Sequence, residues 1–221
     1  MLVICFRMGT SFRSALSWGV ETTAVELVPG VIQAFGFYHA DAGTWAHHPK
    51  AHIVVDDGWR FLNRTTAKYD VILLDPPPPV EAAGSSLLYS KEYYALAKQH
   101  LKPGGSRQAW YPGPASATRE AVARALHESF PHVHALYPPD GGGLHFLASR
   151  EPLDDLTVDE LLARMPAAAK ADLLDWCGGM FINKVDFASR PSSDPRTCIT
   201  DDQPFNEYYL LRKAGVLAKE R

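Results

Sequence analysis

The sequence has few cysteines, lacks any long apolar run and shows no large excess of charge of one sign. Its three cysteines stand far apart and form no Cys-x-x-Cys pair, which argues against a disulfide framework and against a zinc site. Such cysteine usage is typical of a reducing compartment, so we expect a cytoplasmic location. No apolar run approaches the roughly 18 to 20 residues that a membrane-spanning helix needs, and the opening MLVICF lacks the charged start of a signal peptide. We therefore expect no membrane segment in this chain.

Acidic and basic residues nearly balance. There are 25 Asp and Glu residues against 22 Lys and Arg, which gives a formal net charge of -3. A charge this small gives no reason to expect a nucleic-acid partner. Hydrophobic residues make up 46% of the 221 residues, which is enough to bury one sizeable core. The composition therefore predicts one main domain, residues 1–150, with an extension over residues 151–221.

Short apolar runs alternate with segments of helical character in the first half of the chain. The apolar runs cover residues 2–6, 23–28, 52–55 and 69–74, and the helix after the last of them covers residues 90–101. Continuous apolar runs followed by helices are typical of parallel strands covered on both faces. The sequence therefore predicts an α/β fold with a doubly wound, mostly parallel sheet.

The pattern continues after residue 101. We expect Gly104 and Gly105 to stop a helix that ends at Lys102, with a strand over about 106–111 and a helix over 116–130.

A change of pattern follows. Residues 132–149 predict two strands joined by a turn rich in Pro, Asp and Gly, a terminal hairpin that adds an antiparallel strand at the sheet edge. Amphipathic stretches near 157–164 and 166–176 predict that the extension is helical.

Acidic residues follow three consecutive predicted strands. Glu26 ends the second strand, Asp57 follows the third and Asp75 follows the fourth. Ligands of open α/β sheets bind outside the carboxyl ends of the strands. A carboxylate after the second strand can accept both ribose hydroxyls, and one after the third can accept from an adenine amino group. A lone Glu at a strand end is more often a solvated or capping residue, and Asp57 with Gly58 is more often a turn or a helix N-cap, but the ordered set favours a nucleoside site.

The stretch YDVILLDPPPPV, residues 69–80, ends an apolar run on one acid and four prolines. A buried strand has no packing reason to finish on a carboxylate, and prolines cannot continue a ladder because they lack the N–H. Asp75 therefore serves a chemical role, with the prolines as a stiff segment that directs it, or it caps a turn next to a surface loop.

Histidines cluster between residues 39 and 52, but their spacing matches no metal-binding helix pair. We expect His39, His47, His48 and His52 to be surface or structural residues, and we expect no metal.

The order of these motifs resembles the spermidine synthase (polyamine aminopropyltransferase) family. The matching motifs are a glycine turn, VELVPGV, VVDDGWRFL, YDVILLDPPPPV and LLYSKEYYALAKQHLKPGG. The resemblance covers about residues 2–149 and extends to the class I S-adenosylmethionine-dependent methyltransferase fold with its Rossmann-like sheet. The segment TDDQPFNEYYLLR, residues 200–212, is similar to the tail of bacterial spermidine synthase-like proteins.

This resemblance implies a transferase of polyamine biosynthesis. An aminopropyl group would pass from decarboxylated S-adenosylmethionine to a small-molecule amine, with release of 5'-methylthioadenosine. Asp75 would be the catalytic residue, which binds the substrate amine, orients it and removes its proton. A homodimer is also expected.

The resemblance implies further ligand contacts. Glu26 would hold the ribose and Asp57 the adenine, and Gly9, Thr10 and Gly58 would complete the cofactor-binding set. Gly9 would let the backbone come close to the ligand. Tyr89, by contrast, is expected either to close over the substrate or to pack in the core.

The sequence departs from the family pattern at several positions. Arg7 and Met8 replace glycines of the first turn, Thr10 replaces an Asp that grips the donor's ammonium group, and Pro78 replaces a second Asp after the fourth strand. Met1 lies directly on the first strand, so we expect a fragment, a misplaced start or a different way of working. A methyltransferase that uses S-adenosylmethionine and a noncatalytic nucleoside-binding relative therefore stay open as alternatives.

The orientation of the Arg7 side chain bears on which of two donors the chain prefers. We expect it to point to solvent. If it turns into the pocket instead, it can pair with the carboxylate of S-adenosylmethionine, which the decarboxylated donor lacks.

Overall fold

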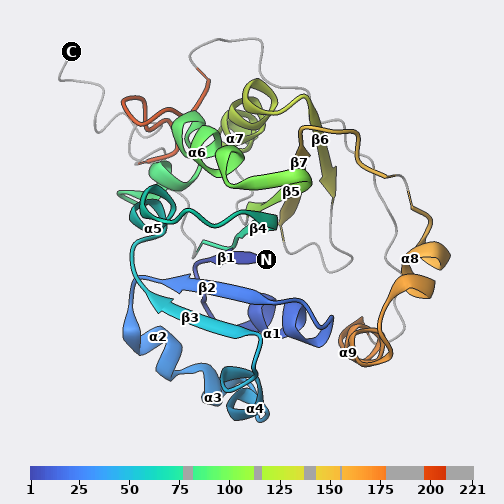
Figure 1. Ribbon diagram of the computed structural model, residues 1–221. Helices are drawn as coiled ribbons and strands as arrows, with labels where there is room; N and C mark the ends of the chain where they lie inside the picture. The colour runs from blue at the N-terminus through green and yellow to red at the C-terminus, as the bar shows by residue number, and fades with distance from the viewer. Residues whose placement is uncertain (77–81, 112–115, 137–142, 155, 178–196, 208–221) are drawn as a thin grey trace.

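The computed structural model describes residues 1–76, 82–111, 116–136, 143–154, 156–177 and 197–207. These residues form a seven-stranded sheet with the strand order β3-β2-β1-β4-β5-β7-β6, and helices pack against it (Figure 1). The strands are β1 (Leu2–Ile4), β2 (Thr22–Glu26), β3 (Ala51–Val55), β4 (Tyr69–Leu74), β5 (Leu101–Tyr111), β6 (His132–Leu136) and β7 (Leu144–Ser149).

The first five strands pair in parallel, which confirms the predicted α/β fold with a doubly wound sheet. Among the described strands, β7 runs antiparallel to both its neighbours, β5 and β6. The predicted terminal hairpin is therefore confirmed, with β7 next to the edge and β6 on it. The turn of this hairpin lies outside the described residues.

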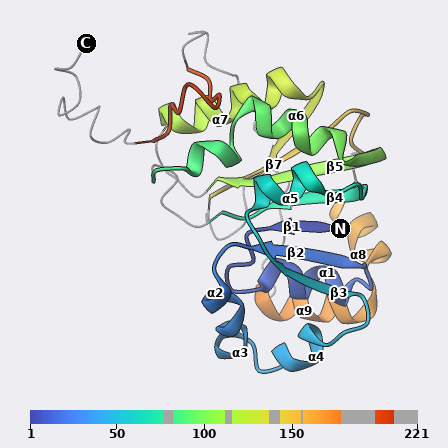
Figure 2. The same cartoon turned by 60° about the vertical axis from the view of Figure 1, so that its left-hand side comes forward.

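The helices follow the strands as the apolar pattern predicts. They are α1 (Thr10–Ser17), α2 (Pro29–Gln33), α3 (Phe35–Tyr38), α4 (Ala42–Ala46), α5 (Gly58–Arg64), α6 (Lys91–Gln99), α7 (Ser116–Ser129), α8 (Val158–Arg164) and α9 (Ala167–Cys177), with a 3₁₀ turn over Ser85–Leu88. In Figure 2, α6 and α7 lie together by β5, whereas α1 and α9 lie together by β1 and β2. None of these helices combines the length and the apolar character that a bilayer crossing requires.

Strand β1 contributes to apolar clusters on both faces of the sheet. Leu2 and Ile4 belong to the cluster that α5, α6 and α7 cover. Val3 points to the opposite face and packs in the cluster of α1, α3 and α4. All three side chains are buried, which explains why the strand is continuously apolar.

The predicted end of the helix before β5 was wrong. Helix α6 ends at Gln99, and β5 already begins at Leu101, which pairs with Tyr69 across the ladder. The register shifts between this pair and the next, so residues 102–105 form an irregularity in the strand. Gly104 has φ 71°, and a Cβ on Gly105 would lie 2.9 Å from a backbone oxygen. The two glycines therefore accommodate a bulge and do not end a helix.

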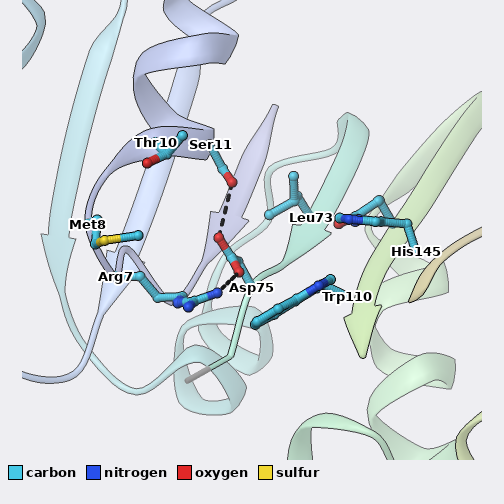
Figure 3. A pocket seen from close by; sticks show the side chains of 9 residues that line it. Arg7, Met8, Thr10, Ser11, Leu73, Asp75, Trp110 and His145 are labelled. Atoms are coloured by element: carbon cyan, nitrogen blue, oxygen red, sulfur yellow. Dashed lines mark hydrogen bonds and ion pairs between the residues drawn. The ribbon is translucent and has the colours of Figure 1, made fainter. Parts of the chain in front are cut away.

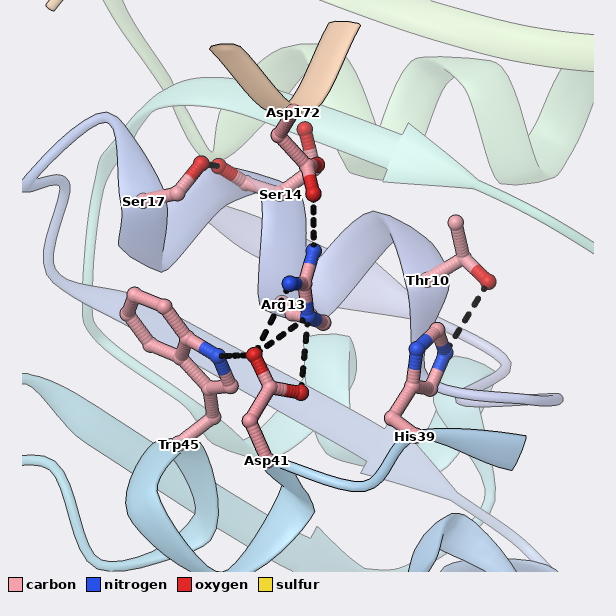
Figure 4. A network of polar contacts seen from close by, with 8 residues as sticks. All are labelled: Thr10, Arg13, Ser14, Ser17, His39, Asp41, Trp45 and Asp172. Atoms are coloured by element: carbon pink, nitrogen blue, oxygen red, sulfur yellow. Dashed lines mark hydrogen bonds and ion pairs between the residues drawn. The ribbon is translucent and has the colours of Figure 1, made fainter. Parts of the chain in front are cut away.

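A polar network joins α9 to α1 and to the residue before α4 (Figure 4). Arg13 on α1 pairs with Asp41 at 2.8 Å and with Asp172 on α9 at 2.7 Å. The indole N–H of Trp45 donates to Asp41 at 2.7 Å. Helices α8 and α9 confirm the predicted helical character of residues 157–164 and 166–176, while the domain boundary at residue 150 stays a prediction.

The same network predicts a pH dependence of stability. The hydrogen bond from Arg13 lowers the pKa of Asp41 to about 2, whereas an unfolded aspartate titrates near 3.9. Ionised Asp41 therefore contributes stability above about pH 4, and this contribution is lost as the pH falls toward 2. We expect Asp41→Asn to lower the urea unfolding midpoint near neutral pH and to have a shrinking effect over this acidic range. A difference that stays constant with pH would contradict the assignment, and Asp154→Asn, at an exposed site, is the control.

Candidate active site

A pocket of about 530 Å³ opens at the carboxyl ends of β1, β4 and β5 (Figure 3). Strands β1 and β4 are neighbours at the point where the strand order reverses, and open α/β sheets bind their ligands at this position. The lining residues come from the turn after β1 and the start of α1, from β4 and its end, and from β5 and β7; they are Arg7, Met8, Thr10, Ser11, Leu73, Asp75, Gln108, Trp110 and His145.

Asp75 lies in this pocket, as its chemical interpretation requires. One carboxylate oxygen is 2.6 Å from Nη1 of Arg7, and the other accepts a hydrogen bond from Ser11 Oγ at 3.1 Å. The backbone N–H of Asp75 donates to the carbonyl of Ile4, which extends the pairing of β1 and β4 by one residue. Pro76 is buried, and the following prolines lie outside the described residues.

Arg7 turns into the pocket, so the expectation that it points to solvent was wrong. Its guanidinium lies 4.5 Å from the centre of the Trp110 ring, in addition to its ion pair with Asp75. The turn after β1 holds it there. Cys5, Arg7 and Gly9 have φ values of 70°, 51° and 80°, and the N–H of Gly9 donates to the carbonyl of Phe6 at 2.8 Å.

The packing and the backbone conformation of the turn after β1 both require a glycine at position 9. A Cβ at this position would lie 2.4 Å from the Phe35 ring, and φ is in the left-handed region. In this structure the side chain of Phe35, and not a ligand, lies close to the backbone of Gly9. Thr10 begins α1, and its hydroxyl lies 3.4 Å from Nε2 of His39. Contact of Gly9 and Thr10 with a donor stays a prediction.

Glu26 is a buried carboxylate at the end of β2. Its two oxygens accept from the backbone N–H groups of Phe6 and Val28, each at 2.9 Å. These bonds tie the turn after β1 to the start of α2. The side chain is therefore held at the strand end, and it is not among the residues that line the pocket of Asp75.

Asp57 caps helix α5. Its Oδ1 accepts from the N–H of Arg60 at 2.8 Å, so the capping role considered from the sequence is present. A Cβ on Gly58 would lie 2.5 Å from Cγ2 of Ile4, because the start of α5 packs directly on β1. The roles of Asp57 and Gly58 toward an adenine stay predictions.

Tyr89 packs in the core in this structure. Its side chain is fully buried, and its hydroxyl donates to the carbonyl of Trp110 at 3.1 Å. Burial raises the pKa of this phenol well above its ordinary value. Of the two sequence expectations, core packing is confirmed, while closure over a substrate stays a prediction.

Five pocket residues were missed by the sequence reasoning: Ser11, Leu73, Gln108, Trp110 and His145. In β5, Gln108 and Trp110 alternate with Ala109 and Tyr111, which are buried in the core. This alternation was the available signal, because side chains two apart on a strand share a face. Across the ladder, Nδ1 of His145 lies 2.6 Å from Nε2 of Gln108.

The C-terminal segment 197–207 is bonded to residues 84–86. Glu207 accepts from the N–H groups of Gly84 and Ser86 at 2.8 and 3.1 Å, and also from the Ser86 hydroxyl. The side-chain amide of Asn206 donates to Ser85 at 2.9 Å. Residues far apart in sequence therefore fix the start of the 3₁₀ turn over Ser85–Leu88.

The described residues contain no group of three His, Cys, Asp or Glu side chains that could hold a metal ion. Of the clustered histidines, His39 lies by Thr10, and His47 lies 2.8 Å from the carbonyl of Gly43.

Comparison with known proteins identifies a matching protein family. The model of the spermine/spermidine synthase domain matches residues 20–130. A polyamine aminopropyltransferase of Sulfurisphaera tokodaii is 31% identical over 127 residues, which cover 56% of this chain and 42% of that protein. One of Synechococcus sp. is 28% identical over 179 residues, which cover 74% of this chain and 57% of that protein. The chain thus spans about half the length of these relatives.

Solved structures show the same fold at low identity. A spermidine synthase in complex with the transition-state analogue AdoDATO has a TM-score of 0.61 at 16% identity, over 98% of this chain and 68% of that one. Human methyltransferase-like protein 13 in complex with SAH has a TM-score of 0.58 at 17% identity, over 85% of each chain. These likenesses support the Rossmann-like methyltransferase sheet.

The packing at Gly58 predicts a stability effect. Gly58→Ala places a methyl group into Ile4 at the junction of α5 and β1, and overpacking of this kind costs about 1 to 3 kcal/mol of unfolding free energy. Gly43→Ala is the matched control, since a Cβ there meets nothing within 4 Å. Equal urea midpoints for the two variants would contradict the close approach.

Proposed function

The chain belongs to the spermine/spermidine synthase family, and we propose that it transfers an aminopropyl group from an adenosyl sulfonium donor to an amine. The donor that the sequence resemblance implies is decarboxylated S-adenosylmethionine, and the implied acceptor is a polyamine. The observation that carries the proposal is the position of Asp75, which lies in a pocket at the switch point of the sheet. Its volume of about 530 Å³ lies within the usual range of small-molecule sites.

The nucleoside part of the donor fits the ends of β2 and β3. The carboxylate of Glu26 offers about four lone-pair positions, of which the N–H groups of Phe6 and Val28 use two. Capacity remains for ribose hydroxyls. The side chains of Leu27 and Val55 are 63% and 53% exposed at these strand ends and offer apolar surface to an adenine ring. Asp57 would accept from its amino group.

The acceptor part fits the other side of the pocket. A cationic amine is attracted both by a carboxylate and by the face of an aromatic ring, and the pocket contains Asp75 and Trp110. The guanidinium of Arg7 makes both of these contacts, so an amine would have to displace it from Asp75.

Asp75 supplies the chemistry of proton transfer. The nitrogen lone pair of the amine attacks the carbon next to the sulfonium, the carbon–sulfur bond breaks, and 5'-methylthioadenosine leaves as a neutral thioether. The proton lost by the amine passes to the carboxylate of Asp75, which acts as general base. Ser11 donates to this carboxylate, and the backbone N–H of Asp75 donates to the carbonyl of Ile4, so both the side chain and the backbone of Asp75 are held.

A noncatalytic nucleoside-binding relative is the second candidate. The observation that favours it is the ion pair of Arg7 with Asp75, since a neutralised carboxylate attracts an amine less strongly. The expected homodimer stays a prediction.

Replacement of Asp75 tests the catalytic role. Asp75→Asn keeps the shape of the side chain but cannot take a proton, so turnover of the amine should fall about 100-fold or more. Binding of 5'-methylthioadenosine should change little. Asp70→Asn is the matched control, because Asp70 lies at the opposite end of β4 and is paired with Lys102 on the surface. Equal turnover of Asp75→Asn and wild type would leave Asp75 as a turn residue.

Replacement of Glu26 tests the nucleoside site. Glu26→Gln should weaken binding of 5'-methylthioadenosine by about 1.5 to 3 kcal/mol, the usual size for hydrogen bonds to a charged group. Isothermal titration calorimetry measures this, and thermal unfolding checks that the bonds to Phe6 and Val28 still hold the fold. The exposed Glu21→Gln is the control. Unchanged affinity in a folded Glu26→Gln variant would remove Glu26 from the site.

A further inference from the structure

Arg7 and Asp75 form a pair of opposite charges inside the pocket (Figure 3). Nη1 of Arg7 is 2.6 Å from Oδ1 of Asp75, and the two side chains are 24% and 17% exposed. They belong to different elements, the turn after β1 and the end of β4, so a ligand can separate them without breaking a strand.

Arg7 and Asp75 are each held in place by a further contact. Arg7 stacks on Trp110 at 4.5 Å and has a φ of 51°, a conformation that costs free energy in a residue other than glycine. Asp75 accepts from Ser11 through its second oxygen. The strained turn after β1 therefore presents a guanidinium to the pocket, and α1 presents a hydroxyl that keeps the carboxylate opposite it.

The charge of a ligand decides whether this pair can open. A plain ammonium gives Asp75 a new partner but leaves Arg7 without one, and a plain carboxylate does the reverse. An α-amino acid group carries both charges and satisfies both side chains, with its carboxylate on Arg7 and its ammonium on Asp75. Arg is suited to this contact because its planar fork binds a carboxylate through two parallel hydrogen bonds.

We propose that the Arg7–Asp75 pair binds the α-amino acid end of the sulfonium donor, so that this chain uses S-adenosylmethionine in place of its decarboxylated form. The inference rests on the proposed function for the nucleoside site and for the displacement, and it changes the donor. The strand order supports the placement, because β3, β2, β1 and β4 follow one another across the sheet. A donor with its adenine and ribose at β3 and β2 extends its arm toward β1 and β4.

The transferred group then keeps its carboxylate. The amine nitrogen attacks the methylene carbon bonded to sulfur, and the electrons of the breaking carbon–sulfur bond go to sulfur. A 3-amino-3-carboxypropyl group is joined to the amine, 5'-methylthioadenosine is released, and the proton of the amine passes to water, because Asp75 is paired with the ammonium group of the donor. No oxidant or reductant is needed.

Calorimetric titration with three nucleosides tests the inference. They are 5'-methylthioadenosine, which has no charged arm, decarboxylated S-adenosylmethionine, whose arm ends in an ammonium group, and S-adenosylmethionine, whose arm ends in both charges. We expect the wild-type chain to bind S-adenosylmethionine about tenfold or more tightly than the decarboxylated form, the size expected for one charge-assisted hydrogen bond.

Variants of Arg7 assign this preference to its side chain. Arg7→Gln should lower the affinity for S-adenosylmethionine about tenfold or more and leave that for 5'-methylthioadenosine unchanged. Arg7→Lys keeps the charge without the planar fork, so its affinity for S-adenosylmethionine should lie between those of wild type and Arg7→Gln. Arg164→Gln, on the exposed surface of α8, controls for loss of positive charge alone. The comparison of donors on the wild-type chain stands even if the Arg7 variants do not fold.

The outcomes separate this inference from the proposed function. Tighter binding of the decarboxylated donor, or equal binding of the two, overturns the inference and leaves aminopropyl transfer standing. Unchanged affinity of folded Arg7→Gln for S-adenosylmethionine also overturns it. Failure of 5'-methylthioadenosine to bind wild type overturns the proposed nucleoside site. With S-adenosylmethionine and an amine, release of 5'-methylthioadenosine supports the displacement, whereas release of S-adenosylhomocysteine supports the donor and overturns the proposed transfer.

Discussion

The parallel pairing of β1 between β2 and β4 is the constraint on which the rest of this structure depends. The strand has only three residues, Leu2–Ile4, and its ladders with both neighbours bring the strand ends into one row. Because the carboxyl ends of parallel strands meet at the same edge, Glu26 and Asp75 are fixed on either side of the turn after β1. Apolar burial on both faces keeps the strand in place.

The turn after β1 converts this row of strand ends into a site. The bonds of Glu26 hold it from the β2 side, and the ion pair of Arg7 with Asp75 holds it from the β4 side. The ring of Phe35 packs against this turn at Gly9. A turn fixed on three sides can keep Arg7 at a positive φ, because the surrounding contacts offset the cost of that conformation.

Distant parts of the chain complete the same edge. Trp110 and His145 come from β5 and β7, and Glu207 of the C-terminal segment accepts from the N–H groups of Gly84 and Ser86. On the other face, Asp172 joins α9 to α1 through Arg13. Helix α1 is therefore fixed at its start by Ser11, which bonds Asp75, and in its middle by Arg13, which bonds α9.

The sequence by itself determined the α/β fold, the order of its strands along the chain, several of its helices and the position of the acids Glu26, Asp57 and Asp75 at strand ends, because burial of continuous apolar runs and capping are local effects. Prediction from the sequence failed where a residue is compatible with two local conformations or orientations. Gly104 and Gly105 can end a helix or form a bulge, and only the pairing of Leu101 with Tyr69 decided for the bulge. Arg7 can face solvent or the pocket, and the decision came from Asp75 and Trp110, which are 68 and 103 residues away in sequence. Such contacts depend on the pairing of strands across the sheet, and no local pattern records them.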